Sequence, residues 1–316
     1  MKKMKLLLLG GLLFASQSIF GQFAPVKGFN FSQLEGKKLL VPTYAVSASF
    51  AKKMIKKGKL DDLASSEDKV AAYNRNWEEA MAESSYDASD YEITGYDRKK
   101  LIKEKNQEAI LLYYYYDDYG NRTANLMVTH PKKKTIARVL TNGMDLSDKN
   151  DIRLMINMLN EALNTSVELE NEGNKNYKGA RNKYKENFVS FYEGIEDKTF
   201  LVPKSEHKNE KKATQRTADL KSALNSWKLS EYELTTTSEI ENKRIEGDED
   251  AYYWRDIPYY TQNILVVYHY NYIISADSDD VLFMFLGKSR LKPATLEKIE
   301  SKMAKKYARY KSQLAK

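Results

Sequence analysis

The residues best suited to recognition chemistry are five aromatic side chains between positions 252 and 260. They are Tyr252, Tyr253, Trp254, Tyr259 and Tyr260. Tyrosine and tryptophan join a flat apolar face to a polar group, so they supply much of the contact area in protein and sugar recognition. We therefore predict a polar loop that carries a candidate binding surface. The alternative is that the rings pack over a sheet, because contiguous exposed aromatic patches are uncommon.

Acidic residues gather at five places in the chain. The clusters are Asp61-Asp62, Asp117-Asp118, Asp145–Asp151, Asp248–Asp250 and Asp277–Asp280. Paired carboxylates can act as acid and base on glycosides or can bind calcium. Ser147 and Lys149, however, interrupt the ligand alternation that a calcium loop of the EF type needs. Turns and helix starts favour aspartate through local hydrogen bonds, and this is the simpler explanation.

Histidine, cysteine and glycine give little support to catalysis. His130, His207 and His269 lack a partner at the spacing that holds a metal. The chain has no cysteine, which excludes thiolate catalysis and disulfides, and its 14 glycines form no phosphate-binding loop. The sequence thus predicts no catalytic residue, no metal site and no cofactor.

Residues 1–22 have the pattern of a secretory signal peptide. Lysines at positions 2, 3 and 5 precede the uncharged run 6–15, and small residues follow, with cleavage after Gly21 or after Ser18. Ten residues are too few to span a bilayer, which needs about 20. The segment is similar to the signals of Gram-negative envelope proteins. We expect export to the periplasm or the exterior, with peripheral attachment to the outer membrane as an option and no transmembrane segment after signal removal.

The charge balance argues against nucleic acid as a partner. The formal charge is +7, and removing the three signal lysines lowers it to +4. This small excess is spread over a chain of which 30% is charged, whereas nucleic-acid binding needs a concentrated basic patch. The segment from about residue 294 predicts a helix with basic residues opposite an apolar stripe. Such a helix can lie on a membrane, but a solvated face is the commoner reason for the pattern.

The two halves of the chain share landmarks in the same order. Residues 33–42 and 194–203 are identical at five of ten positions. Tryptophans at 77 and 227 follow, then Tyr91–Thr94 and Tyr232–Thr235, then Ile110–Tyr116 and Ile264–Tyr270. The first half is longer before Tyr91, and the second is longer before Ile264, in polar stretches where loops absorb insertions. We infer an internal duplication, in which residues 252–260 lie within an insertion peculiar to the second half.

The hydrophobic periodicity predicts the same order of elements in each half: strand, helix, strand, hairpin and closing helix. The fold class is therefore α/β (α+β), with two tandem repeats of a mixed β-sheet and helices packed on it, after a signal peptide. Ser147 is the expected N-cap of the helix that closes the first half. The predicted boundaries are 1–22 for the signal, 29–163 for the first repeat, 164–187 for a polar linker or exposed helix, and 188–316 for the second repeat.

Taken together, these features predict an exported, non-enzymatic envelope protein that serves as a macromolecule-binding or structural module. Its expected partner is another envelope protein or a glycan. One alternative is a carbohydrate- or peptidoglycan-binding module that uses the aromatic residues 252–260. Another is a hydrolase whose carboxylates face a cleft between the repeats.

Overall fold

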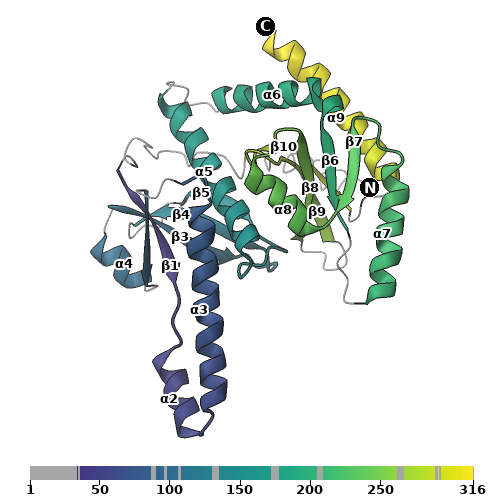
Figure 1. Cartoon of the computed structure of the whole chain (residues 1–316). Coiled ribbons are helices and arrows are strands. Elements are labelled where there is room, and N and C mark those ends of the chain that lie inside the picture. Colours follow the sequence, from purple (N-terminus) through teal and green to yellow (C-terminus); the bar gives the residue numbers. More distant parts are fainter. Residues whose placement is uncertain are drawn as a thin grey trace, which may run out of the picture. The chain divides into compact units, whose positions relative to one another are not determined.

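The computed structural model describes residues 34, 36–86, 90–95, 98–105, 108–129, 135–171, 178–204, 209–261, 267–288, 291 and 293–315. The predicted signal peptide, residues 1–22, lies outside the described residues. The chain divides into two compact units, each built around one five-stranded sheet with helices (Figure 1).

The sheet of the first repeat has the order β2-β1-β3-β4-β5. Strand β1 pairs in parallel with β2 on one side and with β3 on the other, and β4 and β5 continue the sheet in antiparallel pairs. The strands are β1 (Lys38–Thr43), β2 (Tyr91–Gly95), β3 (Ala109–Tyr116), β4 (Arg122–Val128) and β5 (Thr135–Leu140).

The sheet of the second repeat has the same topology, with the order β7-β6-β8-β9-β10. Its central strand β6 is parallel to β7 and β8, while β9 and β10 are antiparallel. The strands are β6 (Thr199–Pro203), β7 (Glu231–Thr235), β8 (Ala251–Tyr260), β9 (Val267–Ser275) and β10 (Val281–Lys288). The predicted fold class, two tandem repeats of a mixed sheet with helices, is therefore confirmed.

The strand register confirms two of the landmarks and corrects a third. Leu39 faces Tyr91 in the first sheet as Phe200 faces Tyr232 in the second, which matches the sequence superposition. On the other side, however, Leu39 faces Ile110 where Phe200 faces Tyr252. The equivalent of β3 is therefore β8. The prediction that Ile264–Tyr270 corresponds to Ile110–Tyr116 was therefore wrong, because the strand equivalent to Ile110–Tyr116 is the preceding one, β8. Residues 252–260 form part of this strand and are not an insertion.

Helices connect the strands and cover the sheets. The first repeat contains α2 (Ala48–Lys56), α3 (Leu60–Ala82), α4 (Arg98–Glu104) and α5 (Lys149–Asn171). The second contains α6 (Lys178–Glu193), the short 3-10 helix η3 (Ile195–Asp197), α7 (Glu210–Leu224), α8 (Thr237–Glu246) and α9 (Pro293–Leu314). Residues 164–171 continue α5 and residues 178–187 belong to α6, so the described part of the predicted linker is helical. None of the helices in the described ranges is long and apolar enough to cross a membrane.

Local hydrogen bonds explain where several helices begin. The carboxylate of Asp148 accepts from the backbone N–H groups of Asn150 and Asp151, so Asp148 and not Ser147 caps α5. Ser147 instead bonds the carboxylate of Asp145. Helix α8 begins with a capping box between Thr236 and Glu239, a residue pair that satisfies two backbone donors at once.

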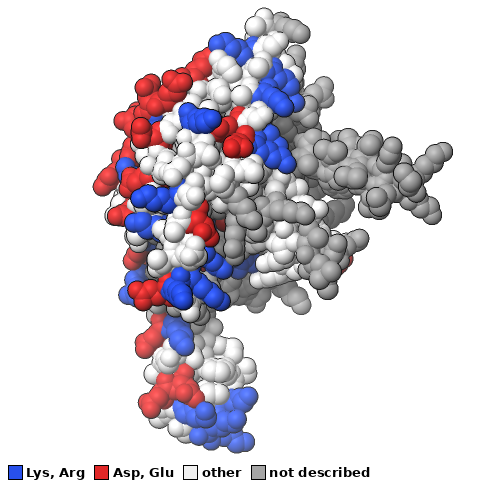
Figure 2. Space-filling model, turned by 90° about the vertical axis from the view of Figure 1, so that its right-hand side faces the viewer, with Lys and Arg blue, Asp and Glu red and all other residues white. Residues whose placement is uncertain are grey.

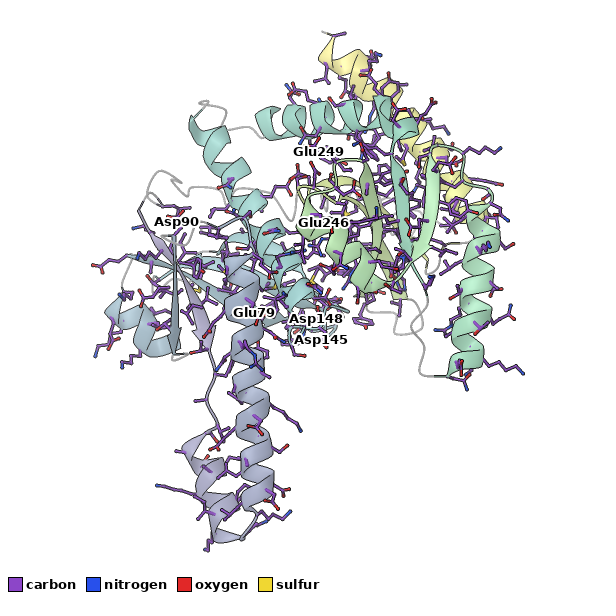
Figure 3. All side chains as sticks on the ribbon, in the orientation of Figure 1. Glu79, Asp90, Asp145, Asp148, Glu246 and Glu249 are labelled. Atoms are coloured by element: carbon purple, nitrogen blue, oxygen red, sulfur yellow. The ribbon has the colours of Figure 1, made fainter. Side chains whose placement is uncertain are left out.

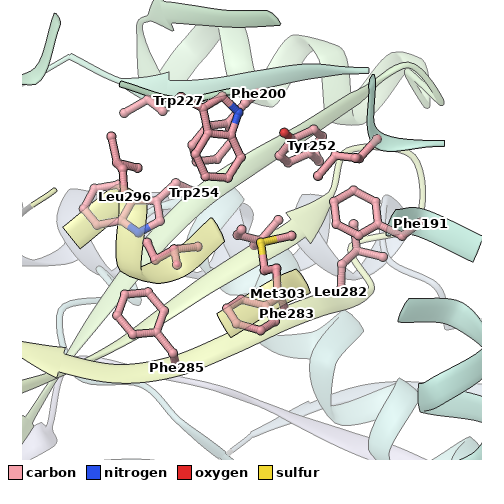
Figure 4. Packing of buried hydrophobic residues seen from close by; sticks show 14 of the residues in the cluster. Phe191, Phe200, Trp227, Tyr252, Trp254, Leu282, Phe283, Phe285, Leu296 and Met303 are labelled. Atoms are coloured by element: carbon pink, nitrogen blue, oxygen red, sulfur yellow. The ribbon is translucent and has the colours of Figure 1, made fainter. Parts of the chain in front are cut away.

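The core of the second repeat lies between its sheet and helices α6 and α9. Figure 4 shows rings from β6, β8 and β10 meeting apolar side chains of α9. The predicted stripe of α9 is buried at Leu296, Ile299 and Met303. In the first repeat, Ile152, Met155 and Leu159 recur along one face of α5 and are buried in the same way.

Candidate functional site

The aromatic run that suggested a binding loop lies in strand β8. Tyr252, Tyr253 and Trp254 are buried, Tyr259 is partly buried, and Tyr260 is 40% exposed at the strand's end. The predicted loop is therefore corrected to a strand, and three of its five rings cannot form a surface contact in this conformation. The remaining candidate for recognition in this run is the end that carries Tyr259 and Tyr260.

Tyr252 occupies the centre of the second repeat's core. Its ring stacks on Phe200, with centroids 5.0 Å apart, and meets the edge of Phe191 at 5.1 Å. The hydroxyl of Tyr252 lies 2.6 Å from Oγ of Ser230. Burial raises the pKa of Tyr252 above its ordinary value. This tyrosine thus has a structural role, with its polar end satisfied.

Tyr253 points to a buried ionic network on the opposite face of the sheet. Its hydroxyl donates to Asp279 at 3.1 Å, and the guanidinium of Arg244 lies over its ring. Arg244 donates two hydrogen bonds to Asp279, each 2.6 Å long, and a third to Glu241. Asp279 has a φ of 58°, a conformation that aspartate tolerates better than most residues. The network joins α8 to the turn between β9 and β10.

His269 has an acidic partner that sequence spacing does not reveal. Nδ1 of His269 lies 2.6 Å from Oδ2 of Asp256, across the pair of strands β9 and β8. A carboxylate at Nδ1 orients an imidazole for proton transfer or metal binding through its other nitrogen. In the described part of the chain, however, no group of three or more metal-ligating side chains gathers. His130 and His207 lie outside the described residues.

The acidic clusters lie at turns and helix starts. Asp61 and Asp62 are in the first turn of α3, and Asp145 and Asp148 precede α5, near Glu79 of α3 (Figure 3). Hydrogen bonds to Ser147 lower the pKa of Asp145. Carboxylates in these places satisfy backbone donors and interact favourably with helix N-termini.

The first repeat carries a helical arm, which we define as residues 48–66. It contains α2, the turn after it and the beginning of α3, and it extends beyond the first sheet (Figure 1). Helix α3 begins at residue 60, well after β1 ends at 43, whereas α7 begins at 210, soon after β6 ends at 203. The arm therefore accounts for the extra length of the first half before Tyr91.

The tip of the arm exposes large apolar side chains among lysines. Ile55 and Leu60 are 58% and 61% exposed on the two sides of the turn. Figure 2 shows the basic group at this end of the arm, beside acidic residues. The exposed lysines are Lys52, Lys53, Lys56, Lys57 and Lys59. Among them, Lys59 pairs with Asp62 at 2.9 Å, and the other four lysines form no ion pair with the described residues.

The turn at the tip has a defined geometry. Gly58 adopts a φ of 65°, and its N–H donates to the carbonyl of Ile55 at 3.0 Å. The N–H of Lys59 donates to the carbonyl of Met54, also at 3.0 Å. This pair of bonds is a Schellman motif, for which glycine is the favoured residue. Met54 is buried where α2 packs on α3, so the tip is held by backbone and by packing.

The base of the arm is fastened to the body of the repeat through α3. The side-chain amide of Asn74 makes two hydrogen bonds of 2.9 Å with the backbone of Tyr44. The rings of Tyr44 and Tyr73 meet edge to face at 5.2 Å, and burial raises the pKa of Tyr73 to about 12. Further along α3, Trp77 is buried in the body of the repeat.

The fold and these surfaces define a class of protein: a duplicated α/β scaffold in which one repeat carries a basic helical arm. Comparisons of the chain with models of protein families, with curated proteins and with solved structures found no match. The candidate site therefore has to be judged by its own chemistry.

Proposed function

We propose that this chain is an exported, non-enzymatic envelope protein that binds another component of the envelope through the arm of its first repeat. The observation that carries the proposal is the exposure of Ile55 and Leu60 at the tip of the arm. Large aliphatic side chains grouped with basic residues at one exposed end are typical of an interaction site. Export rests on the predicted signal peptide, residues 1–22.

The comparison of the two repeats supports this assignment. Both sheets have the same strand order and pairing, so the shared parts are explained by the need to fold. The arm adds little to the core, because Met54 is the buried residue of α2. A structural extension that contributes so little burial is better explained by a partner than by stability.

The test is retention of the protein by purified envelope fractions. In one variant, the arm and the next three residues of α3, positions 48–69 together, are replaced by a short Gly-Ser linker that joins Ser47 to Val70. We expect the wild-type chain to sediment with the envelope and the variant to remain soluble with an unchanged melting transition. Equal retention of the two proteins would show that the arm is not the contact. Mass spectrometry of the exported chain, which gives its first residue, tests the predicted cleavage.

A glycan partner is the second candidate, supported by the exposed end of β8. Tyr260 is exposed there, and Tyr259 meets Tyr270 edge to face at 5.5 Å. Aromatic faces of this kind bind sugars. Calorimetric titration with peptidoglycan fragments, using the wild type and Tyr260→Ala, tests this candidate; equal heats from the two proteins would exclude Tyr260 as a contact.

A further inference from the structure

We infer that the partner of the arm is an anionic lipid surface, into which Ile55 and Leu60 insert while the neighbouring lysines contact lipid phosphates. This inference deepens the proposed function and depends on it. It is carried by three features of the tip, which are its charge, its apolar side chains and its small contact area.

The charge of the tip complements an anionic surface. Five lysines and no acidic residue lie between Ser47 and Leu60, and Asp61 and Asp62 follow. Asp62 already pairs with Lys59, so the lysines at 52, 53, 56 and 57 keep the net charge positive. Long lysine side chains can place their ammonium groups among headgroups while their methylene stems cover apolar surface.

The apolar side chains are placed where a membrane interface can take them up. Ile55 lies in the last turn of α2 and Leu60 in the first turn of α3, with the Schellman turn between them. Insertion of these two aliphatic side chains costs little conformational entropy, because the turn that carries them is already formed. Basic residues beside bulky apolar ones are the pattern of interfacial attachment.

Helix α9, which the sequence also marked as a basic amphipathic helix, lacks this arrangement. Its apolar stripe is buried in the core of the second repeat, at residues such as Leu296 and Met303. Lys306 turns inward, with its ammonium 4.7 Å from the ring centre of Phe283 and 2.8 Å from the hydroxyl of Tyr184. Helix α9 thus has basic residues but its apolar stripe is buried, whereas the arm has exposed lysines together with exposed aliphatic side chains.

The small size of the tip favours lipid over a protein partner. A stable protein interface buries about 800 Å² on each side and needs complementary shape. Two aliphatic side chains at a turn present far less area, whereas a lipid surface adapts its shape to what enters it. A sugar would need a flat aromatic platform. The residues at the tip are aliphatic and basic instead.

The experiment measures sedimentation of the chain from residue 23 onward with phospholipid vesicles. One set contains phosphatidylglycerol and phosphatidylethanolamine, and the other contains phosphatidylcholine alone. We expect binding to the anionic vesicles that weakens as salt is raised, and little binding to the neutral ones. Equal binding to both vesicle types would overturn the inference.

Two variants separate the charge from the apolar contribution. Replacing Lys52, Lys53, Lys56 and Lys57 with glutamine keeps helix propensity and should weaken binding by roughly several hundredfold, at about fivefold per lysine. Its matched control changes four exposed lysines of the second repeat to glutamine, at 211, 212, 221 and 305. Ile55→Ser with Leu60→Ser should weaken binding about tenfold per side chain. Its control is Ile245→Ser, a residue 55% exposed on α8.

The outcomes distinguish this inference from the proposed function. If the wild type ignores anionic vesicles but envelope fractions still retain it through the arm, the partner is a protein or glycan and the lipid inference is wrong. If loss of the arm leaves retention by the envelope unchanged, the proposed function itself is wrong. If each control weakens vesicle binding as much as its arm variant, the tip is not the lipid contact. Circular dichroism of every variant verifies that it is folded.

Discussion

We expect replacement of the buried Arg244 to destabilise the second repeat. Its guanidinium is buried and donates to Asp279 and Glu241, so Arg244→Met removes the cation that these two buried carboxylates contact. Burial alone would lower the pKa of Arg244, but Tyr253 and the ion pair with Asp279 raise it well above its ordinary value. Removing one partner of a buried ion pair costs about 3–5 kcal/mol, and we expect a loss of this size at pH 7.

The loss should depend on pH in a defined direction. Without Arg244, the burial of Glu241 and Asp279 should favour their protonated forms in the folded chain. The variant therefore binds more protons when folded than when unfolded, and its stability rises as the pH falls toward about 4. In the wild type, both carboxylates keep the buried guanidinium as a partner, so protonation does not stabilise the folded chain in this way. The difference in the free energy of unfolding between the wild type and Arg244→Met should therefore fall at pH 4 to less than half its value at pH 7.

The assay is urea unfolding followed by tryptophan fluorescence in a Trp77→Phe background, so that the signal comes from Trp227 and Trp254 in the second repeat. The matched control is Lys243→Met on the same helix. Its ion pair with Asp248 is 2.9 Å long and partly exposed, and it should contribute at most about 1 kcal/mol. An Arg244→Met loss no larger than this control, or a loss that is independent of pH, would refute the reasoning.

Three further predictions concern single side chains. Burial lowers the pKa of Lys306 from 10.5 to about 7. Between these two pH values the unfolded chain binds one proton more than the folded chain, so the free energy of unfolding should rise with pH across this window. Lys306→Met should remove this rise, as measured by urea unfolding. Tyr252→Phe removes the bond to Ser230 and should cost about 1 kcal/mol by the same method. Asn74→Ala breaks both bonds to Tyr44 and should speed amide exchange in α2 while leaving β3 unchanged.

The first two strands of each repeat could be predicted in register because their sequences stay similar at matched positions. The third could not, since β8 contains Pro258, and proline argues against a central strand. The structure resolves this conflict. Strand β6 pairs with β8 only at residues 251–253, so beyond Tyr253 the described pairs of β8 are with β9 alone. Proline is tolerated there because β8 is by then an edge strand on that side.

The buried ion pair of the second repeat could not be predicted, because its two residues are far apart in the sequence. Arg244 and Asp279 are 35 residues apart, and only the sheet brings their elements together. The arm is a different case, because its signal was present in the sequence as extra length before Tyr91 and as lysines around Ile55. A search for catalytic motifs passes over such a pattern, since lysine and isoleucine at a turn have no defined catalytic spacing.

Equivalent positions show how the two repeats have diverged on one scaffold. By strand register, Tyr114 corresponds to Asp256, and Arg122 corresponds to His269. In the first repeat, the hydroxyl of Tyr114 contacts the sulfur of Met155, 3.8 Å away. In the second repeat, the same two positions hold a hydrogen-bonded polar pair.

Packing constraints act on both sheets alike, so they do not explain a difference at matched positions. Such differences are where selection for separate roles can act, and the arm is the largest of them. The first repeat carries an extension that buries little of its own surface, and the second carries polar groups within its sheet. A duplication retained only for stability would have no reason to place lysines and aliphatic side chains together at an exposed turn. The proposed attachment to an anionic surface supplies such a reason.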